Sequence, residues 1–178
     1  KEISLDEFYH EINHVRNSLI RTEADEVTYC FHIILRYEME KAIFRDNVPV
    51  ENLPELWNQK MKEYLDITPA NDAEGILQDM HWSDGSFGYF PSYLLGSIYD
   101  GMYLEELEKE LGPVDEILKE GRIKEITKWL NKKIHWYGST RTPKEVIANV
   151  CGKEVSAQPL VRYFGKKYAD IYNLDHLM

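Results

Sequence analysis

The sequence predicts an all-α protein. Apolar residues recur every three to four positions through most of the chain, while the alternating pattern of strands is nearly absent. Capping residues, prolines and glycines fall where these periodic segments begin and end. The chain has 178 residues and is 43% hydrophobic, which suffices for a real core. We therefore expect a single helical domain over residues 1–178.

Three helices are expected in the first part of the chain. Ser4 and Glu7 form a capping box that begins a helix running to about Leu19. Thr22, followed by acidic residues, predicts the start of a second helix from about Glu23 to Phe44, which is apolar on most sides and so central. A third helix is expected over LPELWNQKMKEYL, residues 53–65. The inward face of the first helix is predicted to hold Leu5, Phe8, Tyr9, Ile12, Val15 and Leu19.

The second part of the chain is also helical in pattern. Pro91 suits the first turn of a helix that should end near Leu111, before Gly112 and Pro113. Shorter helical segments follow over VDEILKEG and over residues 122–138. Thr142 and Pro143 predict the start of a further helix that closes at residues 151–152. A last helix is expected over about residues 157–172, with an inward face of Leu160, Val161, Phe164, Tyr168 and Ile171.

Composition excludes several classes of function. The net charge of −10 argues against nucleic-acid binding, which depends on Lys and Arg, and the one basic segment, residues 122–136, is interpreted as a solvated helix face. No apolar run approaches the roughly 20 residues that span a bilayer, so no membrane partner is expected. No signal peptide is visible at the N-terminus. Cys30 and Cys151 lack metal or redox spacing, which favours reduced thiols in a cytoplasmic protein.

Residues 75–103 differ from the rest of the chain. They hold seven of the 22 aromatic residues and five of the ten glycines, together with Asp79, His81 and Asp84. Aromatic rings bury large areas, and glycine lets the backbone bend sharply. Two interpretations stay open: an aromatic-rich packed turn, or one wall of a binding cleft that presents polar groups over an aromatic floor.

Three segments give a resemblance to a known family. IRTEAD (residues 20–25), GILQDMHW (residues 75–82) and GYFPSYLLG (residues 88–96) resemble segments of the carboxypeptidase Taq family of metallocarboxypeptidases, and the likeness runs from about Phe8 to the end. The resemblance implies a multi-helix, C-terminal portion of a larger, mostly helical zincin-type carboxypeptidase. It also implies that the metal-binding N-terminal part is absent, so this chain alone should be inactive. Zinc or cobalt is expected in the full-length parent and no metal in this chain.

The resemblance also implies roles for particular residues. The family removes the last residue of a peptide, so a side chain must hold the peptide's C-terminal carboxylate, and the planar fork of Arg21 suits that task. His81, Tyr89 and Tyr93 are the candidates that assist catalysis by donating to the substrate carbonyl or its oxyanion. Support of the substrate-binding loop is assigned to Gln78, Asp79 and Trp82.

Each of these residues also has a structural interpretation. Arg21 could instead pair with Asp25 one helical turn later, and both roles could hold together. His81 could bond to Asp79 or to a backbone group, and either tyrosine could belong to the core. His32, on the second helix, is interpreted as a core histidine with its hydrogen bonds satisfied, and His135 has no predicted partner.

A zinc motif occurs by coincidence near the N-terminus. Residues 10–14, HEINH, match H-E-x-x-H, in which two histidines one helical turn apart bind zinc and the glutamate acts as a base. His10 and His14 should point away from the apolar face, toward solvent, where the shielding and supporting groups of a zinc site are scarce. The family carries its metal motif well before IRxxAD. We therefore interpret HEINH as a false positive.

Two alternatives from other classes remain. One is a small self-contained zinc metalloprotease that uses His10, Glu11 and His14, and the other is a helical protein-interaction domain without catalysis. The expected partners of the preferred interpretation are the C-terminus of a peptide substrate, the missing N-terminal part of the same chain and, for the full-length protein, a second copy in a homodimer.

Overall fold

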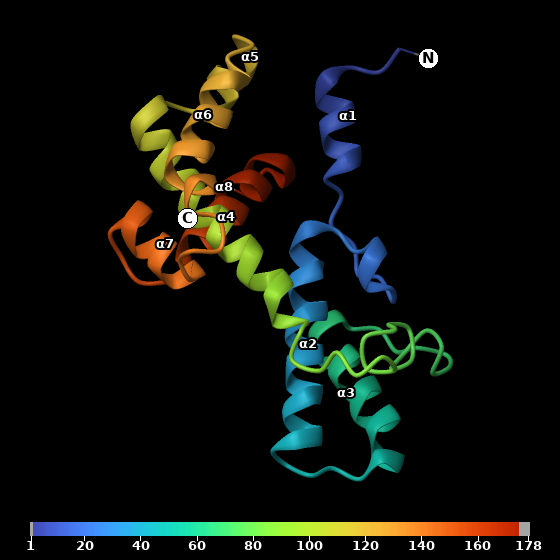
Figure 1. Ribbon diagram of the computed structural model, residues 1–178. Coiled ribbons are helices and arrows are strands. Elements are labelled where there is room, and N and C mark those ends of the chain that lie inside the picture. Colours follow the sequence, from blue (N-terminus) through green and yellow to red (C-terminus); the bar gives the residue numbers. More distant parts are fainter. Residues whose placement is uncertain (1, 175–178) are drawn as a thin grey trace. The chain divides into compact units, whose positions relative to one another are not determined.

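The computed structural model describes residues 2–174 and confirms the all-α prediction (Figure 1). These residues form eight α-helices and three short 3₁₀ segments, and none of them lies in a strand. The chain divides into two compact units, Lys1–Leu94 and Leu95–Met178, which are described separately. Among the described residues, no helix combines the length and the apolar character that crossing a bilayer requires.

The first unit has two long helices. The elements are α1 (Leu5–Ile12), η1 (Arg21–Glu23), α2 (Glu26–Phe44), η2 (Val50–Asn52) and α3 (Leu53–Leu65). A segment of turns without helix or strand, residues 66–90, then leads to α4 (Pro91–Leu111), whose predicted bounds are confirmed. The predicted bounds of α3 are confirmed as well.

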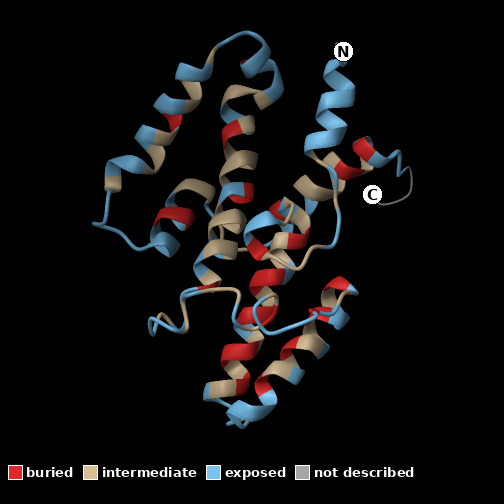
Figure 2. Ribbon diagram, turned by 90° about the vertical axis from the view of Figure 1, so that its right-hand side faces the viewer, coloured by how far each residue is buried: buried red, intermediate tan, exposed pale blue. Residues whose placement is uncertain are grey.

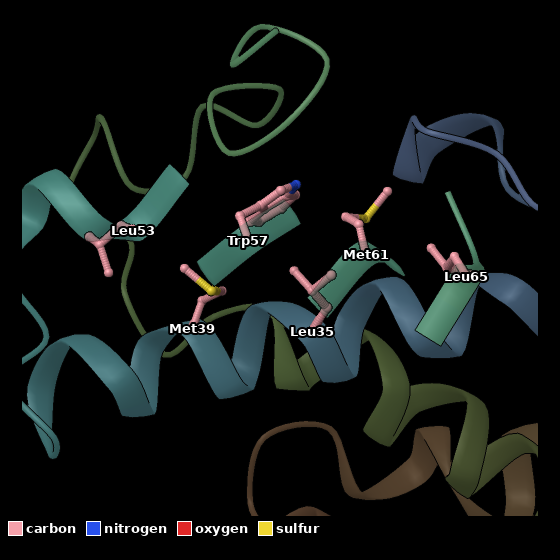
Figure 3. Packing of buried hydrophobic residues seen from close by; sticks show 6 residues of the cluster. All are labelled: Leu35, Met39, Leu53, Trp57, Met61 and Leu65. Atoms are coloured by element: carbon pink, nitrogen blue, oxygen red, sulfur yellow. The ribbon is translucent and has the colours of Figure 1, made fainter. Parts of the chain in front are cut away.

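The core of this unit lies between α2 and α3. Figure 3 shows the side chains of α2 and α3 pointing toward one another, and all six that it labels are 7% exposed or less. Burial of such side chains removes apolar surface from water and stabilises each by about 1.5–3 kcal/mol relative to exposure. The six are Leu35, Met39, Leu53, Trp57, Met61 and Leu65. Trp82, from the segment of turns, packs against the same cluster.

The prediction for the first helix is wrong in length and in burial. Its capping box at Ser4 is present, but α1 ends at Ile12, not near Leu19. The Asn13 side chain donates to the carbonyl of Tyr9 at 2.9 Å and so competes with continuation of the helix. None of its residues is buried, and Figure 2 draws α1 as exposed.

The second helix begins later than predicted. Residues 21–23 form their own 3₁₀ turn, and Asp25, not Thr22, is the N-cap of α2. The Asp25 carboxylate accepts from the backbone N–H groups of Val27 and Thr28 at 3.0 and 2.9 Å. An aspartate at this position satisfies free donors of the first turn, which fixes the start of α2 at Glu26.

The second unit contains most of α4 and the four later helices. They are α5 (Val114–Lys119), α6 (Ile123–Lys133), α7 (Pro143–Cys151) and α8 (Gln158–Tyr172), with a 3₁₀ turn, η3 (His135–Tyr137), after α6. The predicted N-cap of α7 at Thr142 is confirmed, and it forms a capping box with Glu145. One predicted inward residue of α8 is wrong, since Val161 is 57% exposed. In this unit α4 meets the start of α8 at Gly101, whose absent Cβ would lie 2.8 Å from the backbone nitrogen of Leu160.

Candidate functional site

Gln78 fastens the segment of turns to the chain around η1. Its side-chain amide donates to the carbonyls of Leu19 and Glu74 at 3.0 and 2.9 Å. Its amide oxygen accepts from the backbone N–H of Arg21 at 3.0 Å and from the guanidinium of Arg36 at 2.8 Å. One side chain therefore fixes the position of Arg21 relative to α2, across separations of 57 and 42 residues.

Asp79 lies between two arginines. The guanidinium of Arg21 contacts its carboxylate through Nε and Nη2, with a shortest distance of 2.6 Å to Oδ1. Arg36 reaches Oδ2 through Nε, also at 2.6 Å. Burial raises the pKa of Asp79, but the two guanidinium groups outweigh this effect and hold that pKa below its usual value. The carboxylate is therefore ionised at neutral pH.

Arg36 is the most deeply buried charge of this group. Its side chain is 1% exposed and lies against the rings of Trp57 and Phe90, with Cζ at 4.9 and 5.3 Å from the ring centroids. Burial lowers the pKa of Arg36 to about 10, so the guanidinium stays charged at pH 7. Two positive charges thus face one negative charge, and the group carries one uncompensated positive charge.

His81, Tyr89 and Tyr93 come together around Phe90. Nε2 of His81 lies 3.1 Å from the hydroxyl of Tyr93, and the ring of His81 lies 4.4 Å from that of Phe90. The rings of Tyr89 and Tyr93 meet edge to face at 5.4 Å. Tyr89 is 51% exposed, so its side chain is accessible from solvent. The other ring nitrogen of His81, Nδ1, is buried and makes no hydrogen bond.

The same rings border the arginine pair. Cζ of Arg21 lies 5.3 Å from the ring centroid of Tyr93 and 5.7 Å from that of Phe90. Nη1 of Arg21 donates to the hydroxyl of Tyr29 at 3.2 Å. The site therefore combines a positively charged guanidinium, an imidazole and three phenol hydroxyl groups, a set of donors suited to an anionic ligand with a neighbouring carbonyl.

The structure brings most of the predicted residues together. Arg21, Asp79, His81 and Tyr93 surround Phe90 or bond to one another, and Gln78 supports them. Trp82 bonds elsewhere: its indole N–H donates to Glu40. Whether these residues act on a substrate stays a prediction.

Two alternative pairings and the expectation for His32 are wrong. Arg21 pairs with Asp79 and not with Asp25, whose carboxylate caps α2 and accepts from the backbone N–H of Arg16. Nδ1 of His81 is 4.0 Å from Asp79, too far for the expected hydrogen bond. His32 is fully buried as expected, yet neither of its ring nitrogens has a hydrogen-bond partner.

Sequence reasoning missed the structural roles of Arg36 and Glu40. Both are charged residues at buried positions in the apolar run of α2, which is the signal that could have found them, because buried charges require partners. Their partners in the segment of turns lie 42 to 48 residues away. The unpredicted partner of His135 is Asn131, at 2.8 Å.

The structure does not place the histidines of HEINH on one helix. Since α1 ends at Ile12, His14 lies beyond it, and both His10 and His14 are exposed. Within residues 2–174, no group of three or more His, Cys, Asp or Glu side chains is arranged to hold a metal ion. The described residues therefore do not fit a metal centre.

Solved structures that are similar to this chain include two carboxypeptidases. The chain superimposes on the M32 carboxypeptidase from Deinococcus radiodurans R1 with a TM-score of 0.93 at 29% identity, covering 96% of this chain and 35% of that one. It superimposes on a Pyrococcus furiosus carboxypeptidase with a TM-score of 0.90 at 38% identity, covering 93% and 33%. In sequence it is 48% identical to "Carboxypeptidase 1" of Bacillus subtilis (strain 168) over 98% of this chain and 35% of the relative.

The family of this chain is identified by a match to a protein-family model. The model of the family described as "Carboxypeptidase Taq (M32) metallopeptidase" matches residues 1–168. The chain belongs to this family, which confirms the resemblance drawn from IRTEAD and GILQDMHW. It spans about a third of the length of the relatives it matches.

Proposed function

We propose that this chain is the C-terminal, substrate-binding portion of a metal-dependent carboxypeptidase and that Arg21 holds the C-terminal carboxylate of the peptide. One observation carries the proposal: two arginines share the single carboxylate of Asp79, so one positive charge remains uncompensated. An uncompensated charge at a partly buried position attracts an anion strongly, because solvent screens it less than at the surface.

The contacts of Arg21 leave room for such an anion. A guanidinium has five N–H donors, and Asp79 occupies the edge formed by Nε and Nη2. The remaining contact, from Nη1 to the hydroxyl of Tyr29, is long at 3.2 Å and joins a charged to a neutral group. A peptide carboxylate would form a stronger, charge-assisted bond there and displace the phenol.

His81, Tyr89 and Tyr93 are suited to the adjacent peptide bond. The hydroxyl of Tyr93 lies against Nε2 of His81, so either group can donate a proton to a carbonyl oxygen placed beside them. The ring of Tyr93 also borders Arg21, at 5.3 Å. A peptide whose terminal carboxylate reaches Arg21 would thus place its last carbonyl near this pair.

The metal belongs to the part of the parent that this chain does not contain. When bound, zinc or cobalt supplies an activated water for hydrolysis. Because the described residues offer no set of metal ligands, this chain alone is proposed to be inactive and to depend on the N-terminal part of the parent. We further propose a cytoplasmic location and a homodimer for the full-length protein.

The test is to measure the Michaelis constant, KM, of the full-length protein and its variants. Substituting Arg21→Ala should raise KM for N-acylated dipeptides with a free C-terminus about tenfold to a hundredfold, the loss expected for a hydrogen bond to a charged group. Arg16→Ala, at an exposed arginine five residues earlier, is the matched control and should leave KM unchanged. An unchanged KM for a folded Arg21→Ala protein contradicts the assignment.

A further inference from the structure

The two arginines that share Asp79 are bound in different ways. Arg36 donates to Asp79 from Nε, to Gln78 from Nη2 at 2.8 Å and to the carbonyl of His32 from Nη1 at 2.8 Å. Every nitrogen of this guanidinium is thus engaged by an acceptor of the protein. Because the side chain is 1% exposed and every guanidinium nitrogen already has an acceptor, Arg36 has no route to a ligand.

Arg21 is held on one edge only. Its Nε and Nη2 contact Asp79, while the one contact of its Nη1 among residues 2–174 is the neutral hydroxyl of Tyr29. Its side chain is 9% exposed and borders the ring of Tyr93. The geometry therefore separates a fixed arginine from an arginine that can exchange a neutral contact for an anion.

We infer that Arg36 is a positioning residue that neutralises Asp79 and so leaves the charge of Arg21 available to the substrate carboxylate. This inference rests on the proposed function. If Arg21 were the sole partner of Asp79, the two charges would cancel, and an incoming carboxylate would compete with Asp79 for the same guanidinium. With Arg36 in place, Asp79 keeps a partner while Arg21 binds a second anion.

Charge accounting makes the inference testable. The three side chains of Arg21, Arg36 and Asp79 together carry one positive charge. Arg36→Met reduces that charge to zero, whereas the double variant Arg36→Met with Asp79→Asn restores one positive charge, now on Arg21 alone. A purely structural role for Arg36 predicts the opposite order, because the double variant loses more of the buried hydrogen bonds than the single variant.

The experiment compares these variants in the full-length protein. For N-acylated dipeptides, Arg36→Met should raise KM about tenfold or more while changing kcat by less than about threefold, and the double variant should return KM to within about threefold of the parent value. Inhibition by N-acetylphenylalanine, relative to its amide, should follow the same order, because only the acid carries the carboxylate. Arg45→Met, an exposed arginine that directly follows α2, is the matched control.

Folding of each variant is checked by circular dichroism. If Arg36→Met does not fold, Arg36→Lys tests the inference in its place. Lysine keeps the charge but cannot make the three contacts of the guanidinium, so KM near the parent value supports the inference and a rise equal to that of Arg21→Ala overturns it. A double variant as impaired as Arg36→Met also overturns it. If instead Arg21→Ala leaves KM unchanged, the proposed function itself fails, which is a different outcome.

Discussion

Glu40 on α2 holds Trp82 in the segment of turns. Its Oε1 accepts from the indole N–H of Trp82 at 2.9 Å and also from the backbone N–H of Gly88 at 3.0 Å. Glu40 as a residue is 7% exposed. One buried oxygen thus fixes both ends of the bend from Trp82 to Gly88, directly before the tyrosines of the candidate site.

Substituting Glu40→Ala should therefore destabilise this bend. Two donors lose their acceptor. Because Trp82 is partly buried and Gly88 is exposed, most of the loss comes from the indole N–H, and an unsatisfied donor costs about 1–3 kcal/mol of the free energy of unfolding. Glu40→Gln is the matched control, since its amide oxygen can still accept both bonds, and it should lose less than half as much. Urea unfolding followed by tryptophan fluorescence measures the difference. Equal losses in the two variants would show that the charge matters and the acceptor does not.

Local signals predicted the helices better than the site. The predicted start of α4 at Pro91 and the predicted N-cap of α7 at Thr142 depend on neighbouring residues, and both are correct. The motif residues Arg21 and Asp79 were found by resemblance, but their mutual pairing was not, because it spans 58 residues. Charged residues inside an apolar helix, such as Arg36, identify a need for partners without identifying them.

Gly101 of α4 is expected to tolerate no side chain. A Cβ there would lie 2.8 Å from the nitrogen and 2.9 Å from the Cα of Leu160, and backbone atoms cannot move aside as a flexible side chain can. Gly101→Ala should lower the free energy of unfolding by about 1–3 kcal/mol through overpacking. Gly96→Ala, in the same helix with nothing within 4 Å, should instead raise it by up to about 1 kcal/mol, because alanine favours helix. Thermal unfolding of the two proteins should show opposite shifts.

The HEINH segment should bind no zinc. His10 and His14 are exposed and do not share a helical face, because α1 ends at Ile12. The purified 178-residue chain is incubated with zinc, passed through gel filtration and analysed for metal. The parent and His10→Ala should then contain the same amount of zinc. Neither protein should release a C-terminal residue from N-acylated dipeptides. Stoichiometric zinc that disappears in His10→Ala would favour the self-contained metalloprotease instead.

Acid should destabilise the first unit through His32. The ring is fully buried, and neither of its nitrogens has a hydrogen-bond partner. Burial, and then the charge of Arg36, lowers the pKa of His32 from 6.5 to about 4. The unfolded chain therefore takes up a proton between pH 6.5 and 4 while the folded chain does not, so stability is present above this window and is lost as the pH falls through it.

The variant His32→Leu isolates this contribution, since it removes the titrating group and two unsatisfied nitrogens while roughly preserving volume. From pH 7 to 4.5 the parent should lose about 2 kcal/mol more of its free energy of unfolding than His32→Leu, because each pKa unit corresponds to about 1.4 kcal/mol. The lowered pKa of Asp79 contributes to both proteins and cancels in the comparison. Urea unfolding at the two pH values measures the difference, with the exposed His10→Leu as the matched control. Parallel losses in parent and His32→Leu would mean that the buried imidazole gains a proton as readily as a free one.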